Sequence, residues 1–361
     1  MLPEVTVLMS VHNGEKYLRE SIESILHQTF TDFEFLIIND RSTDASRDII
    51  LSYDDPRIRL IDNKKNVGQA TSLNIGLQEA EGKFIARIDQ DDISMPDRLR
   101  KQVHFMVNNS EVGVLGTKAQ FLNEAGEGFS LRYDEKLYET DDMMKAQLLF
   151  KSCFLHPSTM IRTDILREYN LSYQEEYKLS EDYLLWFKLS SFCRFANLPQ
   201  SLIKYRHHKE QLSTDLGYDQ FSSSINIRKI ILEDFLGREV SQVQLVRHTK
   251  ISVAQCGSTI AEINQAEKWL QLLVQGNNTI KKYKSESFFQ VLENVWMLLC
   301  MNSSHLGMKL LLKYLSSTFR RFKIENFYQE MKLIIKCLIK YKVRLLEYDW
   351  TFENQEVELS E

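Results

Sequence analysis

The N-terminal part of the chain alternates short runs of apolar and β-branched residues with segments of helical periodicity. The predicted strands are Val5–Val11, Phe33–Ile38, Ile58–Ile61 and Phe84–Ile88. The predicted helices between them are Tyr17–Leu26, Ala45–Leu51 and Gln69–Ala80. Strands that alternate with helices through short loops form a mainly parallel sheet that is covered on both faces. Ligands of such a sheet bind at the carboxyl ends of its strands. The polar residues that follow each run are therefore the first candidates for a functional site.

The composition is that of an ordinary soluble globular protein. The chain has 361 residues, of which 43% are hydrophobic, and this is enough for a large α/β domain and a smaller second unit. Its net charge of -5 argues against a nucleic-acid binder that depends on a generally basic surface. Five cysteines at unpatterned spacings indicate neither a disulfide framework nor a zinc site. This cysteine pattern fits a reducing cytoplasm. Because neither a signal-peptide pattern nor about 18 consecutive apolar residues occur, we expect any membrane contact to be peripheral.

Three carboxylates fall within the run Asp89-Gln90-Asp91-Asp92, directly after the predicted strand that ends at Ile88. Carboxylates this close repel one another, so a fold either leaves them in solvent or neutralises them with a cation. Their hard oxygen ligands favour Mg²⁺ or Mn²⁺. The alternative is a solvated acidic turn that caps the helix predicted to begin near Pro96.

The pattern changes twice further along the chain. From Val112 to Arg206 it is less regular, with short apolar runs at Val114–Gly116 and Thr159–Ile161 that we expect to extend the sheet. After about Thr214 the strand signals fade and helical periodicity takes over. The sequence therefore predicts a first domain over residues 1–214 and a helical accessory domain over residues 215–361.

Four turn motifs follow one another along the first domain: Val11-His12-Asn13-Gly14, Asn39-Asp40-Arg41-Ser42, Asp89-Gln90-Asp91-Asp92 and Glu181-Asp182-Tyr183. This series resembles the family 2 glycosyltransferases, over about residues 3 to 213. The resemblance implies the GT-A fold, a Rossmann-like α/β architecture with a mainly parallel sheet flanked by helices, here followed by an all-α segment. It also implies transfer of a sugar, with inversion, from a nucleotide-diphosphate donor to an acceptor hydroxyl.

The first two motifs are implied to bind the donor nucleotide. By the resemblance, Val11 and Asn13 belong to the donor-binding turn, and Asp40 accepts a hydrogen bond from uracil. The alternative for Asp40 is a turn or helix-capping aspartate. Arg41 replaces the glycine that is more usual in the family, and a negative φ would accommodate its side chain.

The acidic motifs are implied to carry the chemistry. The resemblance makes Asp91 the direct metal ligand, Asp89 a ligand of ribose or sugar, and Asp92 a supporting carboxylate. Asp182 is implied as the general base that removes the proton from the acceptor hydroxyl. The alternative for Glu181-Asp182 is an ordinary acidic first turn, because a helix N-terminus favours negative charge.

A further segment, Tyr205-Arg206-His207-His208-Lys209-Glu210-Gln211-Leu212-Ser213, resembles the family's closing segment over the diphosphate. There His208 would ligate the metal or bind phosphate, and Arg206 would supply positive charge near the leaving group. A solvated loop is the alternative. His156-Pro157-Ser158 also matches a family pattern near the acceptor pocket, and a buried structural histidine explains it equally well.

The C-terminal helices are basic. Between Lys309 and Arg344 ten Lys or Arg stand against two Glu, a net charge of +8. The helical spacing of the apolar residues there indicates either a bundle with a solvated basic face or helices that rest on an anionic membrane. Acidic residues from Glu347 to Glu361 would pair with these helices or lie in solvent.

The sequence thus predicts a cytoplasmic, Mn²⁺- or Mg²⁺-dependent glycosyltransferase that uses a UDP-sugar to extend a bacterial surface glycan. A lipid-linked oligosaccharide at the inner membrane face would suit the basic helices, which could equally form a dimer interface. One alternative is a nucleotidyltransferase. Such an enzyme would normally have a glycine-rich, basic phosphate loop near the N-terminus, and the segment Val11–Lys16 is a poor match to that loop. Another is a non-catalytic carbohydrate-binding or scaffold protein, in which loss of Asp91 or Asp182 would be expected; both are present.

Overall fold

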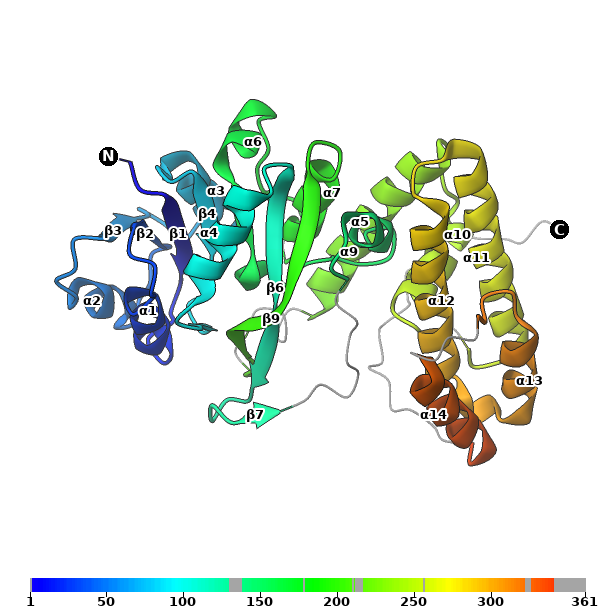
Figure 1. Cartoon of the computed structure of the whole chain (residues 1–361). Coiled ribbons are helices and arrows are strands. Elements are labelled where there is room, and N and C mark those ends of the chain that lie inside the picture. Colours follow the sequence, from blue (N-terminus) through cyan, green and yellow to red (C-terminus); the bar gives the residue numbers. More distant parts are fainter. Residues whose placement is uncertain are drawn as a thin grey trace. The chain divides into compact units, whose positions relative to one another are not determined.

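The computed structural model describes residues 2–129, 138–177, 179–209, 211, 217–255, 257–321 and 326–340, with the backbone alone for residues 217–220. The chain forms two compact units, Met1–Lys145 with Ser152–Ser223 and Ala146–Lys151 with Ser224–Glu361 (Figure 1). The assignment of residues 1–214 to a catalytic domain and of residues 215–361 to an accessory domain stays a prediction. Part of the closing segment (Glu210, Leu212, Ser213) and the acidic residues after Lys340 lie outside the described residues.

The first unit is built from strands and helices that alternate through its N-terminal half. Its strands are β1 (Val5–Val11), β2 (Phe33–Asn39), β3 (Ile58–Asp62), β4 (Phe84–Arg87), β5 (Ile93–Ser94), β6 (Val112–Leu122), β7 (Gly128–Phe129), β8 (Met160–Arg162) and β9 (Arg194–Arg206). Its helices are α1 (Leu18–Leu26), α2 (Ser46–Leu51), α3 (Gln69–Glu79), α4 (Arg98–Asn108), most of α5 (Asp141–Gln147), η1 (His156–Ser158), α6 (Thr163–Glu168) and α7 (Glu181–Leu189).

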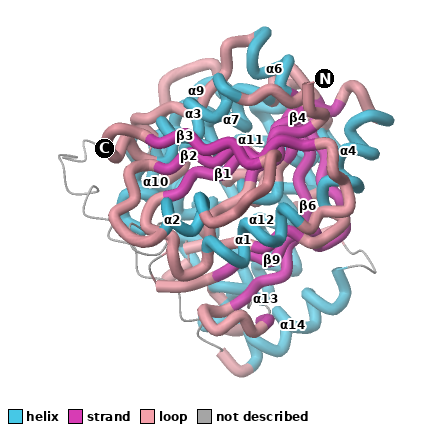
Figure 2. Tube along the Cα trace, turned by 90° about the vertical axis from the view of Figure 1, so that its left-hand side faces the viewer, coloured by secondary structure: helices cyan, strands magenta, loops and turns pink. Residues whose placement is uncertain are grey.

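The strands form one sheet in the order β3-β2-β1-β4-β8-β6-β9-β5, with β7 paired to β6. The first four strands are parallel and lie side by side in Figure 2. Beyond them β8 is antiparallel to β4 and β6, whereas β6 and β9 are parallel. The register pairs Val11 with Asn39 and Asn39 with Asp62, so three strands end side by side. This is the edge at which a parallel sheet binds its ligands.

The sheet has apolar side chains on both faces. Every residue of β1 except Ser10 is buried, because helices cover both sides of this strand. One side forms the main hydrophobic core with residues of α1, α2 and α4, among them Ile22, Ile50 and Leu99. Helix α3 packs on the other side, where a Cβ on Gly76 would meet the side chain of Leu8 at 2.2 Å. The close approach of α3 therefore requires glycine at this position.

The predicted fold class is confirmed, and the sheet is parallel across β3-β2-β1-β4 and mixed beyond. The predicted strands in the N-terminal half appear within one residue of their expected bounds. The structure adds β9, the longest strand, and the short strands β5 and β7. Because β9 carries Arg206 as its last residue, it brings the segment predicted to close the site directly to the sheet.

The second unit is helical. It contains most of α9 (Gly217–Leu236), then α10 (Gln242–Ser252), α11 (Ile260–Ile280), α12 (Ser285–Asn302), η2 (Ser304–Leu306), α13 (Met308–Ser316) and α14 (Phe327–Leu338). Ser241 and Thr259 begin α10 and α11 with capping boxes. In its core, buried His248 accepts a hydrogen bond from Trp269 Nε1 at 3.1 Å and donates through Nε2 to the Leu149 carbonyl at 2.7 Å. This pairing ties residues 146–151 to the helices.

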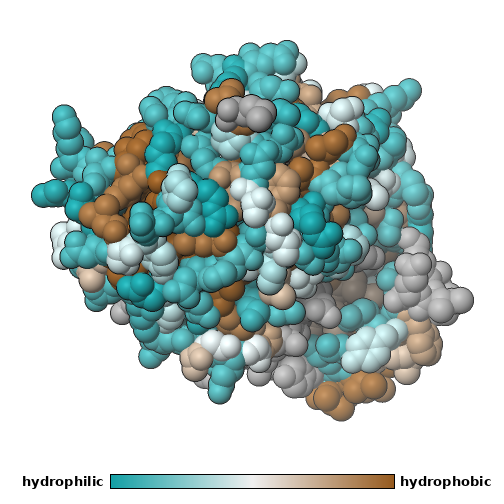
Figure 3. All heavy atoms as spheres, turned by 60° about the vertical axis from the view of Figure 1, so that its left-hand side comes forward, coloured by the Kyte–Doolittle hydropathy of each residue, from teal (hydrophilic) through white to brown (hydrophobic). Residues whose placement is uncertain are grey.

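Hydrophilic side chains cover most of the face drawn in Figure 3, with hydrophobic patches between them. No helix in the described ranges is both long enough and apolar enough to cross a bilayer.

Candidate active site

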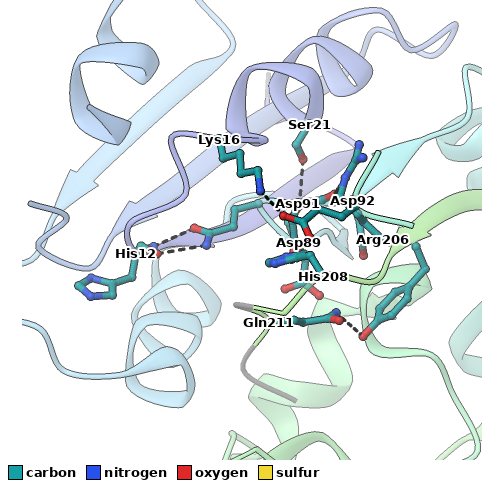
Figure 4. A network of polar contacts seen from close by, with 12 residues as sticks. His12, Lys16, Ser21, Asp89, Asp91, Asp92, Arg206, His208 and Gln211 are labelled. Carbon is teal, nitrogen blue, oxygen red and sulfur yellow. Dashed lines mark hydrogen bonds and ion pairs between the residues drawn. The ribbon is translucent and has the colours of Figure 1, made fainter. Parts of the chain in front are cut away.

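Three carboxylates lie together in the turn Asp89-Gln90-Asp91-Asp92, which follows the end of β4 (Figure 4). One ligand atom from each of Asp89, Asp91 and Asp92 lies within 4.8 Å of the others. Asp92 is 1% exposed, and burial together with the charges of Asp91 and Asp89 raises its pKa well above the usual range. Its Oδ2 atom has no hydrogen-bond partner among the described residues. A nearby cation would stabilise such a cluster.

The segment from Arg206 to His208 holds the same turn from the β9 side. The backbone N–H of Arg206 donates to Asp92 Oδ1 at 2.9 Å, and Arg206 Nε donates to the Asp91 carbonyl at 3.1 Å. His208 Nε2 lies 2.7 Å from Asp91 Oδ2. Arg206 Nη2 also donates to Glu20 Oε2 at 2.6 Å, which fixes the guanidinium beside the turn. Residues from two distant motifs therefore meet at one place.

Arg87, the last residue of β4, is a buried cation beside the aspartates. It is 1% exposed, and its Nη1 atom forms an ion pair with Asp89 Oδ1. Burial raises the pKa of Asp89, whereas the charge of Arg87 lowers it. The Nε atom of Arg87 has no hydrogen-bond partner within the part of the chain that the structure describes. Removing either partner would leave an uncompensated charge.

These residues fit a divalent cation. Aspartate oxygens are the ligands that Mg²⁺ prefers, and Mn²⁺ also accepts imidazole nitrogen. Asp91 and His208 would hold the ion, with Asp89 and Asp92 beside it. The Nδ1 atom of His208 has no hydrogen-bond partner among the residues placed in the structure, as is true of Asp92 Oδ2. Of these two atoms, Asp92 Oδ2 belongs to the cluster of carboxylates and has an unused lone pair there.

Gln90 joins this turn to the turn after β1. The backbone N–H of His12 donates to Gln90 Oε1 at 2.9 Å, and Gln90 Nε2 donates to the His12 carbonyl at 3.1 Å. A Cβ on Gly14 would approach Gln90 Oε1 to 2.6 Å. Glycine at residue 14 therefore permits the two turns to pack against each other.

Val11 and Asn13, predicted to bind the donor, lie at the carboxyl end of β1. Val11 is buried, and its carbonyl accepts from the backbone N–H of Asp40 at 2.7 Å. Asn13 has a φ of 49°, and its Oδ1 atom accepts from the backbone N–H of Thr43 at 2.8 Å. The first two motifs thus form one connected rim at the ends of β1 and β2.

Asp40 organises the loop that follows β3. Its Oδ1 atom accepts from Asn63 Nδ2 and from the backbone N–H of Val67, both at 2.9 Å, and its Oδ2 atom accepts from the backbone N–H of Gly68 at 2.8 Å. Asp40 is 2% exposed. It does not cap α2, whose N-cap residue is Ala45. A role in binding the base stays a prediction.

Arg41 differs from the expectation of a negative φ. Its φ is 58°, in the left-handed region where glycine is favoured. The turn thus keeps the conformation that suits the family's usual glycine, and Arg41 adopts it at a cost of about 1 kcal/mol.

The predicted base, Asp182, lies in the first turn of α7 beside Glu181. Asp182 Oδ2 accepts from Trp186 Nε1 at 3.2 Å, and burial raises the pKa of Asp182. Glu181 is 4% exposed, and burial and the charge of Asp182 raise its pKa to about 7. Arg87 lowers the pKa of both carboxyl groups, so it lies within electrostatic reach of them. The charge of Arg87 thus acts both on Asp89 and on the two carboxyl groups of α7.

His156 is half-buried and lies within electrostatic reach of the same cation. Its Nε2 atom lies 2.8 Å from the Tyr173 hydroxyl. Burial, with a smaller contribution from Arg87, lowers the pKa of His156 well below its usual range, so the imidazole is neutral. The structure thus places this histidine in a partly buried hydrogen bond with Tyr173.

The structure brings Asp89, Asp91, Arg206 and His208 into one cluster, and joins Asp40, Val11 and Asn13 in a neighbouring rim. Asp182 belongs to a separate set of contacts on α7. Our sequence reasoning assigned no role to Arg87 or Gln90. A signal for Arg87 existed, because a single charge within the apolar run Phe84–Ile88 needs a buried partner.

The chain is similar to known glycosyltransferases. A model of glycosyl transferase family 2 matches residues 6–169. An uncharacterized glycosyltransferase of Haemophilus influenzae is 32% identical over 260 residues, which cover 69% of this chain and 79% of that protein. The chain belongs to glycosyl transferase family 2. This glycosyltransferase is also 33% identical over 229 residues to the O-antigen biosynthesis glycosyltransferase WbnJ of Escherichia coli, covering 62% of this chain and 87% of WbnJ.

Solved structures share the fold of this glycosyltransferase. S. aureus TarS 1-349 in complex with UDP-GlcNAc matches it with a TM-score of 0.53 and 18% identity, over 94% of this chain and 91% of that one. The complex of the same protein with UDP gives a TM-score of 0.52, over 93% and 90% of the two chains. These matches confirm the predicted GT-A fold. The family match and the relatives confirm the predicted enzyme class, a glycosyltransferase.

Proposed function

We propose that this glycosyltransferase is a metal-dependent, inverting enzyme that transfers a sugar from a UDP-sugar to an acceptor hydroxyl of a bacterial surface glycan. The observation that carries the proposal is the meeting of Asp89, Asp91 and Asp92 with His208 and Arg206 at the end of β4. The UDP and UDP-GlcNAc complexes of TarS support the choice of donor. The name of WbnJ supports a surface-glycan acceptor.

The rim at the ends of β1 and β2 would bind the nucleotide. Val11 and Asn13 supply backbone and amide groups, and Asp40 supplies a carboxylate that already accepts three hydrogen bonds. A carboxylate has about four acceptor sites. The remaining site of Asp40 suits the imide N–H of uracil, with the loop after β3 held in place by the other three.

The aspartate cluster would bind the diphosphate end of the donor. Mn²⁺ or Mg²⁺ bound by Asp91 and His208 would stabilise the negative charge that develops on the leaving nucleoside diphosphate. Arg206 adds a fixed positive charge beside Asp91. Asp89 would accept hydrogen bonds from the ribose or the sugar.

Asp182 would act as the general base. The acceptor hydroxyl gives its proton to this carboxylate while its oxygen bonds to the anomeric carbon, and the bond from that carbon to the diphosphate oxygen breaks on the opposite face. The product therefore has the inverted configuration. Burial raises the pKa of Asp182, which moves the carboxylate toward the pH at which a base is most effective.

Calorimetric titration with UDP, GDP and TDP, each with and without Mn²⁺, tests the donor site. We expect micromolar binding of UDP that depends on Mn²⁺. The Asp91→Ala variant should lose the Mn²⁺-dependent part, whereas the exposed control Asp54→Ala should bind as the unmodified protein does. Equal UDP affinity with and without Mn²⁺ would contradict the assignment of Asp91.

We further propose that transfer takes place in the cytoplasm at the inner face of the membrane, where a lipid-linked oligosaccharide would be the acceptor. Incubation of the enzyme with UDP-sugars and lipid-linked acceptors, compared with the free oligosaccharides, tests this. Faster transfer to the free acceptor would contradict the location.

A further inference from the structure

Exposed apolar side chains gather on α13, on α14 and on the residue after α14. Nine of the 17 large hydrophobic residues that are exposed in the described part of the chain lie there, with exposed fractions of 39% to 71%. They are Met308, Leu312, Leu315, Phe327, Tyr328, Met331, Ile335, Leu338 and Ile339. Soluble proteins seldom leave so much apolar surface in one region unless it binds something.

These residues form a stripe on each helix. On α13 the positions 308, 312 and 315 follow the helical repeat, and on α14 the positions 328, 331, 335 and 338 do so. The opposite faces pack inward through buried residues such as Leu310 and Leu333. The two helices contact each other, and the Tyr314 hydroxyl donates to Glu330 at 3.0 Å. The two stripes therefore belong to one part of the helical unit, which we call the α13–α14 surface.

The charges on the α13–α14 surface are positive. Lys332, Lys336 and Lys340 follow one another at intervals of four residues beside the α14 stripe, and exposed Lys309 lies beside the α13 stripe. The only acidic residue of the two helices is Glu330, which is buried and paired with Arg320 at 3.1 Å. The exposed and partly exposed residues of α13 and α14 therefore include lysines and no carboxylate.

We propose that the α13–α14 surface binds an anionic lipid membrane, with the apolar stripes at the headgroup and acyl boundary and the lysines near lipid phosphates. A helix pair with exposed apolar stripes and adjacent lysines has the composition of an interfacial element. A second copy of the chain is a poorer occupant, because it would bring like-charged lysines together. The proposal does not depend on the transfer reaction, since lipid binding is measurable without a sugar donor.

Vesicle flotation of the full-length protein tests the proposal. Vesicles of neutral phosphatidylcholine are compared with vesicles that contain phosphatidylglycerol, at low and high salt. We expect flotation with the anionic vesicles, weakened by salt, and little flotation with the neutral ones. Failure to float with anionic vesicles at low salt would overturn the proposal.

Two variants locate the surface. Each lysine near an anionic surface contributes about a five-fold gain in partitioning, so Lys309→Gln, Lys332→Gln and Lys340→Gln together should weaken binding about a hundredfold. The double change Leu312→Ser with Ile335→Ser should weaken vesicle binding at both low and high salt, because it removes apolar contacts that salt does not screen. Each of these side chains is exposed or partly exposed, so the fold should survive; melting curves check this.

Matched controls carry the same chemical changes elsewhere on the helical unit. They are Lys268→Gln on α11 and Val243→Ser on α10, both exposed. We expect them to float as the unmodified protein does. Equal flotation of the surface variants and the controls would overturn the assignment to α13–α14. A concentration-dependent dimer that the surface variants abolish, without vesicle binding, would assign the surface to a second copy instead.

Discussion

Glu181, the buried member of the acidic pair on α7, offers a quantitative test of the site's electrostatics. The change Glu181→Gln replaces the carboxyl group with a neutral amide of the same shape. Burial and the charge of Asp182 raise the pKa of Glu181 from 4.5 to about 7. Between these values the folded protein keeps a proton that the unfolded chain has lost, so the free energy of unfolding falls as the pH rises.

The size of the effect follows from that pKa difference. A rise of about 2.5 pH units corresponds to about 3 kcal/mol at 1.36 kcal/mol per unit. The unmodified protein should thus lose about 3 kcal/mol between pH 4.5 and pH 8 from this group alone. The glutamine cannot ionise, so Glu181→Gln should lack this loss and be the more stable protein at pH 8.

Urea unfolding at pH 5 and pH 8 measures the difference. The control is Glu111→Gln, an exposed glutamate whose change should leave the pH dependence as it is. We expect the stabilities of Glu181→Gln and the unmodified protein to be similar at pH 5 and to separate by pH 8. An identical pH dependence in the two proteins would refute the raised pKa and the buried position from which it arises.

Three further changes test other parts of the site. Asp182→Asn should lower kcat at least a hundredfold and leave the Kd for UDP within about two-fold, because a general base contributes about 10² to 10⁴ in rate; unchanged turnover would exclude Asp182 as the base. Arg87→Met should lower the free energy of unfolding, measured in urea, by about 3 to 5 kcal/mol, because it leaves the partly buried Asp89 unpaired. A decrease of less than about 1 kcal/mol would contradict the burial of this ion pair. Arg41→Gly should raise the unfolding free energy by about 0.5 to 1 kcal/mol, because glycine adopts a φ of 58° without strain; a less stable variant would contradict the strained turn.

The N-terminal half of the fold could be predicted because its signals are local. The apolar runs that became β1 to β4 and the helices between them depend on neighbours a few residues away, so periodicity finds them. Strands β5, β7 and β9 lack such signals. In particular, β9 contains Pro199 and several polar residues, and its pairing with β6 supplies the hydrogen bonds that make it a strand.

The same distinction between local signals and long-range contacts applies to the residues of the candidate site. The acidic motifs and the closing segment are visible in the sequence because they occur as short runs of distinctive residues. The sequence signals that Arg87 needs a buried partner, but it does not identify Asp89 as that partner. It does not show the raised pKa of Glu181 either, because that shift arises from burial in the folded chain.

The sequence by itself determined which residues of this glycosyltransferase can carry charge, ligate a cation or begin a helix, because those properties belong to single side chains and their near neighbours. The tertiary structure decided which of them meet. The Arg206 backbone reaches Asp92 across 114 residues of chain, and His208 reaches Asp91 across 117. Contacts at that separation depend on how the whole sheet is ordered, and the order is set by the packing of both its faces.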